Sequence, residues 1–137
     1  MAPETSGRVL SEQERRNRDA AVEYVDLLSN APDGVDKAMA LIGDTYRQHN
    51  PRVPDGPEGV HAFLTGARAQ YPDMRMEIKR VIVDGEFVVL HCHVRFTEED
   101  RGMAVVDILR VQDGRMVEHW DVGQPIPEED ENGNGMF

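Results

Sequence analysis

The sequence predicts an α+β domain in which helices come first and an antiparallel sheet follows. In the first half of the chain, apolar residues recur every three to four positions in three stretches, which is the spacing of helices. In the second half, apolar and polar residues alternate in four stretches separated by turn residues, as in strands. Because the helices precede the strands instead of alternating with them, we expect them to cover one face of the sheet.

The first helix is predicted to begin near Glu12 and to end at Pro32. Ser11 followed by Glu14 is a capping box, in which each side chain binds the other residue's backbone N–H. Two further helices are predicted over about 35–42, ended by Gly43, and around 60–67, ended before Pro72.

The strands form a meander at the end of the chain, and two Asp-Gly pairs mark tight hairpins between them. A short extended stretch, 45–50, precedes a proline-rich loop, and residues 125–137 form an extended C-terminal arm. We therefore expect a single domain spanning 1–137, with its core over about 12–124. The four strands are predicted over Met74–Val83, Phe87–Phe96, Met103–Val111 and Met116–Val122.

Composition limits the possible functions. The formal net charge of −11 disfavours nucleic acid and anionic membrane surfaces as partners, because both require a basic surface. No apolar run is long enough to span a bilayer, and residues 1–5 lack the basic and apolar regions of a signal peptide. Cys92 is the only cysteine, which excludes an intrachain disulfide and a structural zinc site. A soluble, cytoplasmic protein is expected.

Each Asp-Gly turn can form in two ways, and the choice decides which side chains meet. A two-residue turn at Asp84-Gly85 would pair Lys79 with Leu90 and mix charged with apolar side chains. A three-residue loop with a bulged glycine pairs Ile78 with Leu90 instead, and it separates an apolar face from a charged one. We favour the bulged register on this ground.

The same register in the second hairpin pairs Asp107 with His119 and places Val105 opposite Asp121. Directly opposed residues have Cβ atoms roughly 4.5–5.5 Å apart, so Asp107 and His119 can hydrogen-bond across the strands. Asp121 points to the same face as His119. Such a cluster beneath the helices suits proton transfer at neutral pH. The alternative is a structural role, as a satisfied buried pair or as ordinary charges on a solvated face.

His91 and His93 have the spacing of a metal-binding pair, but both are expected on the outer face of the sheet, away from the helices. Two histidines supply too few ligands, so no metal is expected. Cys92 faces inward among apolar residues and is assigned to the core.

The outer face of the sheet also carries apolar residues. An apolar outer face usually packs against another subunit, so a homodimer is expected through it. The residues concerned are Trp120, Ala104, Val106, Ile108, Val122 and Val89.

The order helix, helix, short strand, helix and four-stranded meander, together with the stretch 102–122, resembles the SnoaL-like branch of the nuclear transport factor 2-like superfamily. Tyr46–Pro51 and residues 132–137 are similar to the same branch, whose members are relatives of polyketide cyclases. The resemblance implies a cone-shaped α+β barrel in which a curved, mainly antiparallel sheet encloses a deep pocket. It leaves the reaction open, because this fold serves isomerases, cyclases, dehydratases, epoxide hydrolases and non-enzymes.

Some positions carry over from the resemblance. Asp107 matches the protonated Asp in the oxyanion hole of ketosteroid isomerases, and Tyr24 is similar to their oxyanion Tyr. Asn50 falls where the isomerases carry a general-base Asp; since Asn cannot accept a proton, the chain departs from isomerase chemistry there. His119 and Asp121 resemble the sheet-borne Asp/His arrangement of SnoaL-type cyclases.

These observations together predict a small-molecule enzyme that needs no cofactor and abstracts a proton next to a carbonyl group. Asp121 or His119 would be the base, and Asp107 would orient His119 or stabilise the enolate. Hydrogen bonds to substrate oxygens would come from Tyr24, His49 and Asn50. The alternatives are a non-catalytic ligand-binding domain, or a hydrolase or dehydratase in which Asp121 activates water.

Overall fold

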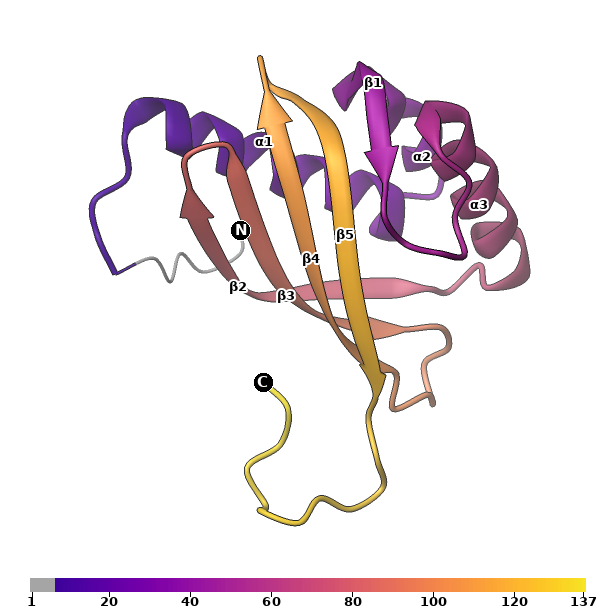
Figure 1. The fold of residues 1–137 in the computed structure, drawn as a ribbon. Coiled ribbons are helices and arrows are strands. Elements are labelled where there is room, and N and C mark those ends of the chain that lie inside the picture. Colours follow the sequence, from indigo (N-terminus) through magenta and orange to yellow (C-terminus); the bar gives the residue numbers. More distant parts are fainter. Residues whose placement is uncertain (1–6) are drawn as a thin grey trace.

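Three helices lie against one face of a five-stranded sheet in the computed structural model, which confirms the predicted α+β class (Figure 1). The structure describes residues 7–137, so the segment 1–5 that was considered as a signal peptide lies outside it. The elements are α1 (Glu12–Asn30), α2 (Gly34–Ala38), a 3₁₀ turn (Met39–Leu41), β1 (Ile42–Gln48), α3 (Gly56–Gln70), β2 (Arg75–Asp84), β3 (Phe87–Arg95), β4 (Met103–Gln112) and β5 (Arg115–Pro125).

The predicted capping box opens α1. The Ser11 hydroxyl accepts a hydrogen bond from the Glu14 backbone N–H (3.1 Å), and the Glu14 carboxylate accepts one from the Ser11 N–H (2.8 Å). Glu14 also binds Arg8 and the backbone N–H of Gly85 in the first hairpin. The Arg8 guanidinium, aided by these N–H groups, holds the pKa of Glu14 below its usual range. The Glu14 carboxylate therefore links the start of α1 to the first hairpin of the sheet.

The second predicted helix is shorter than expected. It ends at Leu41 as a 3₁₀ turn, and Ile42 already belongs to β1. Gly43, predicted to end the helix, lies inside the strand, where a Cβ atom would come within 2.9 Å of Val117. The close approach of β1 to β5, and not helix termination, requires glycine at this position.

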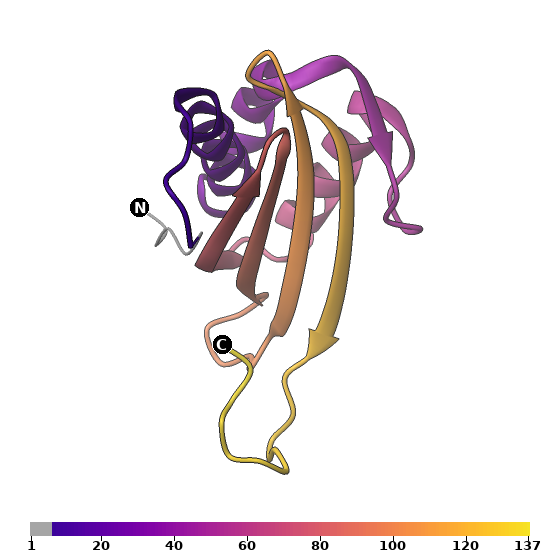
Figure 2. The same cartoon turned by 60° about the vertical axis from the view of Figure 1, so that its left-hand side comes forward.

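The sheet is open and does not close into the barrel that the resemblance implied. Its strand order is β1-β5-β4-β3-β2, so β1 and β2 are its two edges. All neighbouring strands are antiparallel except β1 and β5, which run parallel. Figure 2 shows the sheet curving beside the helices, with the C-terminal arm extending beyond the end of β5.

The predicted register was wrong in detail at both hairpins. Ile78 pairs with Cys92 instead of Leu90, and Asp107 lies opposite Asp121 instead of His119. The second turn is a two-residue turn, in which Asp113 and Gly114 both have positive φ (51° and 75°), as a type I′ turn requires. The extra residue of each hairpin lies further along the strands, where the registers shift between 78 and 80 and between 110 and 111. On the side of each shift away from the turn, the predicted and observed registers differ by two residues. Ile78, Asp107, His119 and Asp121 therefore keep their predicted face.

The inner face of the sheet, the one that faces the helices, is unevenly covered. Leu90, Leu109 and Val88 are fully buried beneath the helices, whereas Val105 and Asp121 on the same face stay partly exposed. One end of the inner face is therefore open to solvent. Within residues 7–137, no helix is both long and apolar enough to cross a membrane.

Candidate active site

The structure brings Asp107, His119 and Asp121 together on the inner face of β4 and β5. His119 Nε2 lies 2.7 Å from Asp107 Oδ1 and 3.9 Å from Asp121 Oδ2. His119 stands opposite Leu109, so it reaches Asp107 diagonally across the strands. The exposed fractions of the side chains are 10% for Asp107, 13% for His119 and 23% for Asp121. Asp121 is thus the most accessible of the three.

The Asp107 carboxylate is buried with one oxygen unsatisfied. Its Oδ2 atom has no hydrogen-bond partner within the described part of the chain. Leaving a buried acceptor unpaired costs about 1–3 kcal/mol, so such atoms are rare and need a reason.

Neighbouring Cys92 is also fully buried, and burial raises the pKa of its thiol, which agrees with a core role.

Gln48, which sequence reasoning missed, holds the other side of the His119 ring. It pairs with His119 across β1 and β5, and its Oε1 atom lies 2.8 Å from His119 Nδ1. The same oxygen accepts a hydrogen bond from the Asn50 backbone N–H (2.9 Å). Alternation along an extended stretch was the available signal, because it places Tyr46, Gln48 and Asn50 on one face.

Asn50 binds Asp121 directly. Its Nδ2 atom lies 2.9 and 3.0 Å from the two carboxylate oxygens. Its Oδ1 atom accepts a hydrogen bond from the Arg52 backbone N–H (2.9 Å), which fixes the amide with its nitrogen toward Asp121. The residue predicted to bind substrate therefore lies beside the predicted base.

Tyr24 and Tyr46 form a buried pair next to this cluster. The Tyr24 hydroxyl donates a long hydrogen bond to the Tyr46 hydroxyl (3.4 Å). Burial raises the pKa of Tyr24 well above its usual value, and burial together with the Asp107 charge raises the pKa of Tyr46 to about 12. Both hydroxyls stay protonated at neutral pH, and Tyr24 contacts the site through Tyr46.

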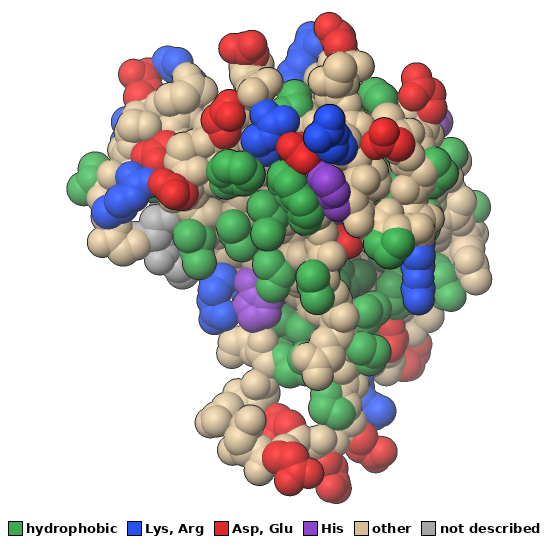
Figure 3. All heavy atoms as spheres, in the orientation of Figure 1, with side chains coloured by type: hydrophobic (Ala, Val, Ile, Leu, Met, Phe, Trp, Pro, Cys, Tyr) green, Lys and Arg blue, Asp and Glu red, His purple; other side chains and the backbone are tan. Residues whose placement is uncertain are grey.

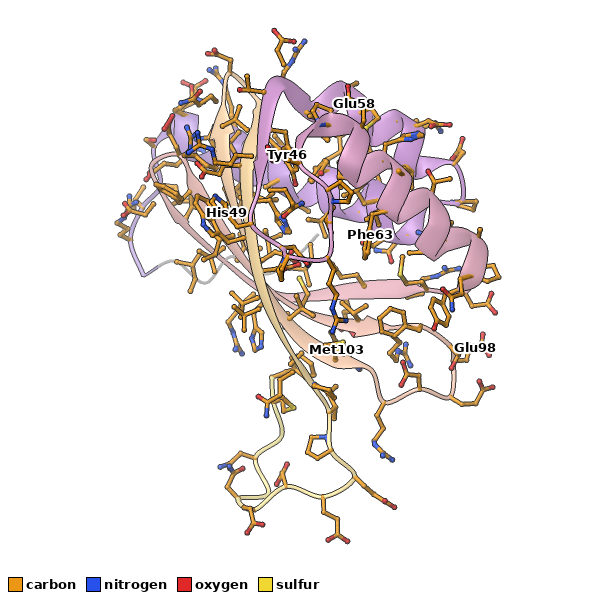
Figure 4. All side chains as sticks on the ribbon, turned by 45° about the vertical axis from the view of Figure 1, so that its right-hand side comes forward. Tyr46, His49, Glu58, Phe63, Glu98 and Met103 are labelled. Carbon is orange, nitrogen blue, oxygen red and sulfur yellow. The ribbon has the colours of Figure 1, made fainter. Side chains whose placement is uncertain are left out.

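The structure does not bring His49 to the cluster. Figure 4 shows Tyr46 on the side of β5 that faces the helices and His49 on the opposite side. The His49 ring stacks on Trp120, with centroids 4.7 Å apart and planes 1° from parallel. Its Nε2 atom hydrogen-bonds Glu118 (2.7 Å), which holds the pKa of that carboxyl below its usual range.

His91 and His93 lie on the outer face, as predicted. Each has a ring nitrogen already engaged, His91 Nδ1 by Arg80 and His93 Nε2 by the Arg101 carbonyl (both 2.8 Å). The Phe137 ring of the C-terminal arm packs against both imidazoles. Asp107, His119 and Asp121 bring possible ligand atoms within 4.8 Å of one another, but Gln48 engages His119 Nδ1 and Asp107 engages His119 Nε2, so neither ring nitrogen is left for a metal ion.

The outer face is rich in exposed apolar side chains. Figure 3 shows them gathered over the front of the sheet, bordered by charged groups at its upper edge. Val122 is 77% exposed, and Ile82, Phe87 and Val106 are more than a third exposed. This surface is the one from which the homodimer was predicted.

Comparison with known proteins decides the family. The family model described as a SnoaL-like domain matches residues 13–119. The chain belongs to the SnoaL-like family. No curated protein matches the sequence.

Solved structures share the SnoaL-like fold of this chain at low sequence identity. A candidate polyketide cyclase from Bacillus cereus is 22% identical, with a TM-score of 0.71, and the match covers 88% of this chain and 83% of that one. A candidate ketosteroid isomerase from Kribbella flavida is 20% identical, with a TM-score of 0.69 and coverages of 86% and 84%. A candidate SnoaL-like polyketide cyclase from Jannaschia is 16% identical, with a TM-score of 0.69 and coverages of 86% and 92%. At these identities the likeness establishes the fold of the SnoaL-like domain and not its reaction.

Proposed function

We propose that this SnoaL-like protein is a cofactor-independent enzyme that abstracts a proton next to a carbonyl group of a small molecule. The observation that carries the proposal is the cluster of Asp107, His119 and Asp121, in which the outermost carboxylate reaches solvent beside partly exposed apolar side chains. Such surroundings suit an uncharged, largely apolar carbonyl compound.

In the proposed reaction, the Asp121 carboxylate removes the proton from the carbon next to the carbonyl. The C–H bond breaks, an O–H bond forms on Asp121, and the electron pair moves to the carbonyl oxygen. Asn50 Nδ2 lies about 3 Å from both Asp121 oxygens, which one N–H can bridge, and its second N–H donates a hydrogen bond to the carbonyl oxygen of the substrate. Return of the proton to another carbon gives an isomerase, and attack of the enolate carbon on a second carbonyl gives a cyclase.

The test is hydrogen–deuterium exchange at the carbon next to the carbonyl, followed by NMR in D₂O on a panel of apolar cyclic ketones and 1,3-diketones. Exchange requires only proton abstraction, so the natural substrate need not be known. The protein should accelerate exchange of at least one compound, and Asp121→Asn should lower that rate by about 10²–10⁴-fold.

Asp44→Asn is the matched control, because Asp44 is an exposed carboxylate of β1 whose ion-pair partner is Arg115. It should leave exchange unchanged. If compounds bind but their exchange is not accelerated, the protein is a non-catalytic ligand-binding domain and not an enzyme. Equal exchange rates in the wild type and Asp121→Asn would show that Asp121 is not the base.

A further inference from the structure

The segment 48–52 holds two side-chain amides in known orientations. Gln48 Oε1 accepts the Asn50 backbone N–H, and Asn50 Oδ1 accepts the Arg52 backbone N–H, both at 2.9 Å. A backbone N–H can only donate, so the atom that faces it in each amide must be the oxygen. The two amides therefore present chemically opposite groups to the active site, an oxygen from Gln48 and a nitrogen from Asn50.

The fixed oxygen of Gln48 determines the tautomer of His119. An amide oxygen only accepts, so His119 Nδ1, 2.8 Å away, must carry a proton to form this hydrogen bond. His119 Nε2 then faces Asp107 Oδ1 at 2.7 Å. An unprotonated Nε2 against an ionised carboxylate would place two acceptors in contact, so a second proton must lie between these atoms.

The fixed nitrogen of Asn50 acts in the opposite sense on Asp121. An amide N–H stabilises the ionised carboxylate, because it can only donate. The negative charge of Asp121, 3.9 Å from His119 Nε2, in turn favours the proton on the imidazole over the proton on Asp107.

We propose that Gln48 is a positioning residue that fixes the His119 ring with a proton on Nδ1, so that Asp107 and His119 hold one proton between them while Asp121 stays free to accept another. The inference deepens the proposed function and rests on it for its catalytic meaning, but the tautomer is a property of the protein alone. Gln48 does not touch the reacting atoms and acts through His119.

The test compares wild type, Gln48→Glu and Gln48→Met by ¹⁵N NMR of the imidazole ring, with His119 assigned from the spectrum of His119→Gln. Glu keeps an acceptor at this position, whereas Met has a similar length and offers almost none. Nδ1 should be protonated in the wild type and in Gln48→Glu. In Gln48→Met the proton should leave Nδ1, and the ring should keep Nε2–H toward Asp107. Gln70→Met, on the exposed end of α3, is the matched control and should leave the His119 signals unchanged.

Exchange kinetics supply the second readout. Groups one step removed from the chemistry typically contribute about 10–100-fold, so Gln48→Met should lower kcat by about that factor with KM unchanged, and Gln48→Glu should restore most of it. A wild-type ring with unprotonated Nδ1 would overturn the inference, and so would the same tautomer in wild type and Gln48→Met. If Gln48→Met does not fold, the wild-type spectrum alone still shows whether Nδ1 carries the proton. If the tautomer is as expected but no ketone exchanges, the proposed function fails and the positioning role of Gln48 stands.

Discussion

Replacing Asp107 by Asn removes one negative charge and almost no volume, so it isolates the electrostatic coupling between Asp107 and His119. The charged atoms of the pair lie 2.7 Å apart, and both side chains are about nine-tenths buried. Loss of the carboxylate leaves His119 Nε2 without its charged partner inside the protein, so the variant should have a lower free energy of unfolding.

The expected size follows from the geometry. Two unit charges about 4 Å apart interact by about 4 kcal/mol at an effective dielectric constant of 20. The cost of removing both charges from water offsets much of this energy, and the hydrogen bond that Asn can still form reduces the loss further. We therefore expect a coupling free energy between Asp107 and His119 of about 1–3 kcal/mol.

The assay is a double-mutant cycle of urea unfolding with Asp107→Asn, His119→Gln and the double variant. The chain contains its own control, because His61 Nε2 also lies 2.7 Å from a carboxylate, that of Asp36. Those two side chains are 41% and 86% exposed, so water and salt screen the pair, and the matching cycle of Asp36→Asn with His61→Gln should give a coupling free energy below about 0.5 kcal/mol. A coupling near zero between Asp107 and His119 would refute the shared proton. So would equal coupling in the two pairs, because burial would then make no difference.

Three further predictions follow from other parts of the molecule. We propose that the outer face forms a homodimer, so Val122→Glu should halve the mass measured by light scattering, whereas Val9→Glu, at a position that is also largely exposed, should not; a monomeric wild type would contradict this. Glu14→Gln should lower the unfolding temperature at pH 7, and the difference should shrink as the pH falls below about 4, because the lowered pKa of Glu14 contributes stability only while the carboxylate is ionised. Elemental analysis of protein purified without added metal should find no stoichiometric zinc, iron or manganese, since both ring nitrogens of His119 are engaged and His91 and His93 have no third possible ligand beside them within the described residues; one equivalent of any of these metals would contradict this.

The faces of the strands could be predicted from the sequence, but their exact pairing could not. The predicted and observed registers of these three residues differ by two positions. A shift of two leaves the alternation unchanged, so Asp107, His119 and Asp121 share one face in both. The extra residue of the second hairpin is Val117, which packs against Gly43 of β1, a contact between segments about 70 residues apart. Nothing local to the Asp113-Gly114 turn indicates that contact.

The residues predicted to bind substrate show a second limit of the same kind. His49 and Asn50 are neighbours in an extended stretch, so they cannot both face the site, and the same alternation adds Gln48. Applying the two-residue period to the stretch 45–50 would have replaced His49 with Gln48. The stacking of His49 on Trp120 required the parallel pairing of β1 with β5, which no sequence pattern specified.

That parallel pairing also has a consequence for folding. The hydrogen bonds of Gln48 to His119 and of Asn50 to Asp121 each join residues 71 positions apart, whereas β2, β3 and β4 are linked by short connections. Contacts that close long loops form slowly, because the chain loses conformational entropy before the contacts can stabilise it. We therefore expect the hairpins to assemble before β1 docks on β5. A chain arrested at that stage would be compact and rich in secondary structure, yet it would lack both amides that orient His119 and Asp121. Recovery of proton-transfer activity should consequently be the last event in refolding, after the far-ultraviolet signal of the strands has returned.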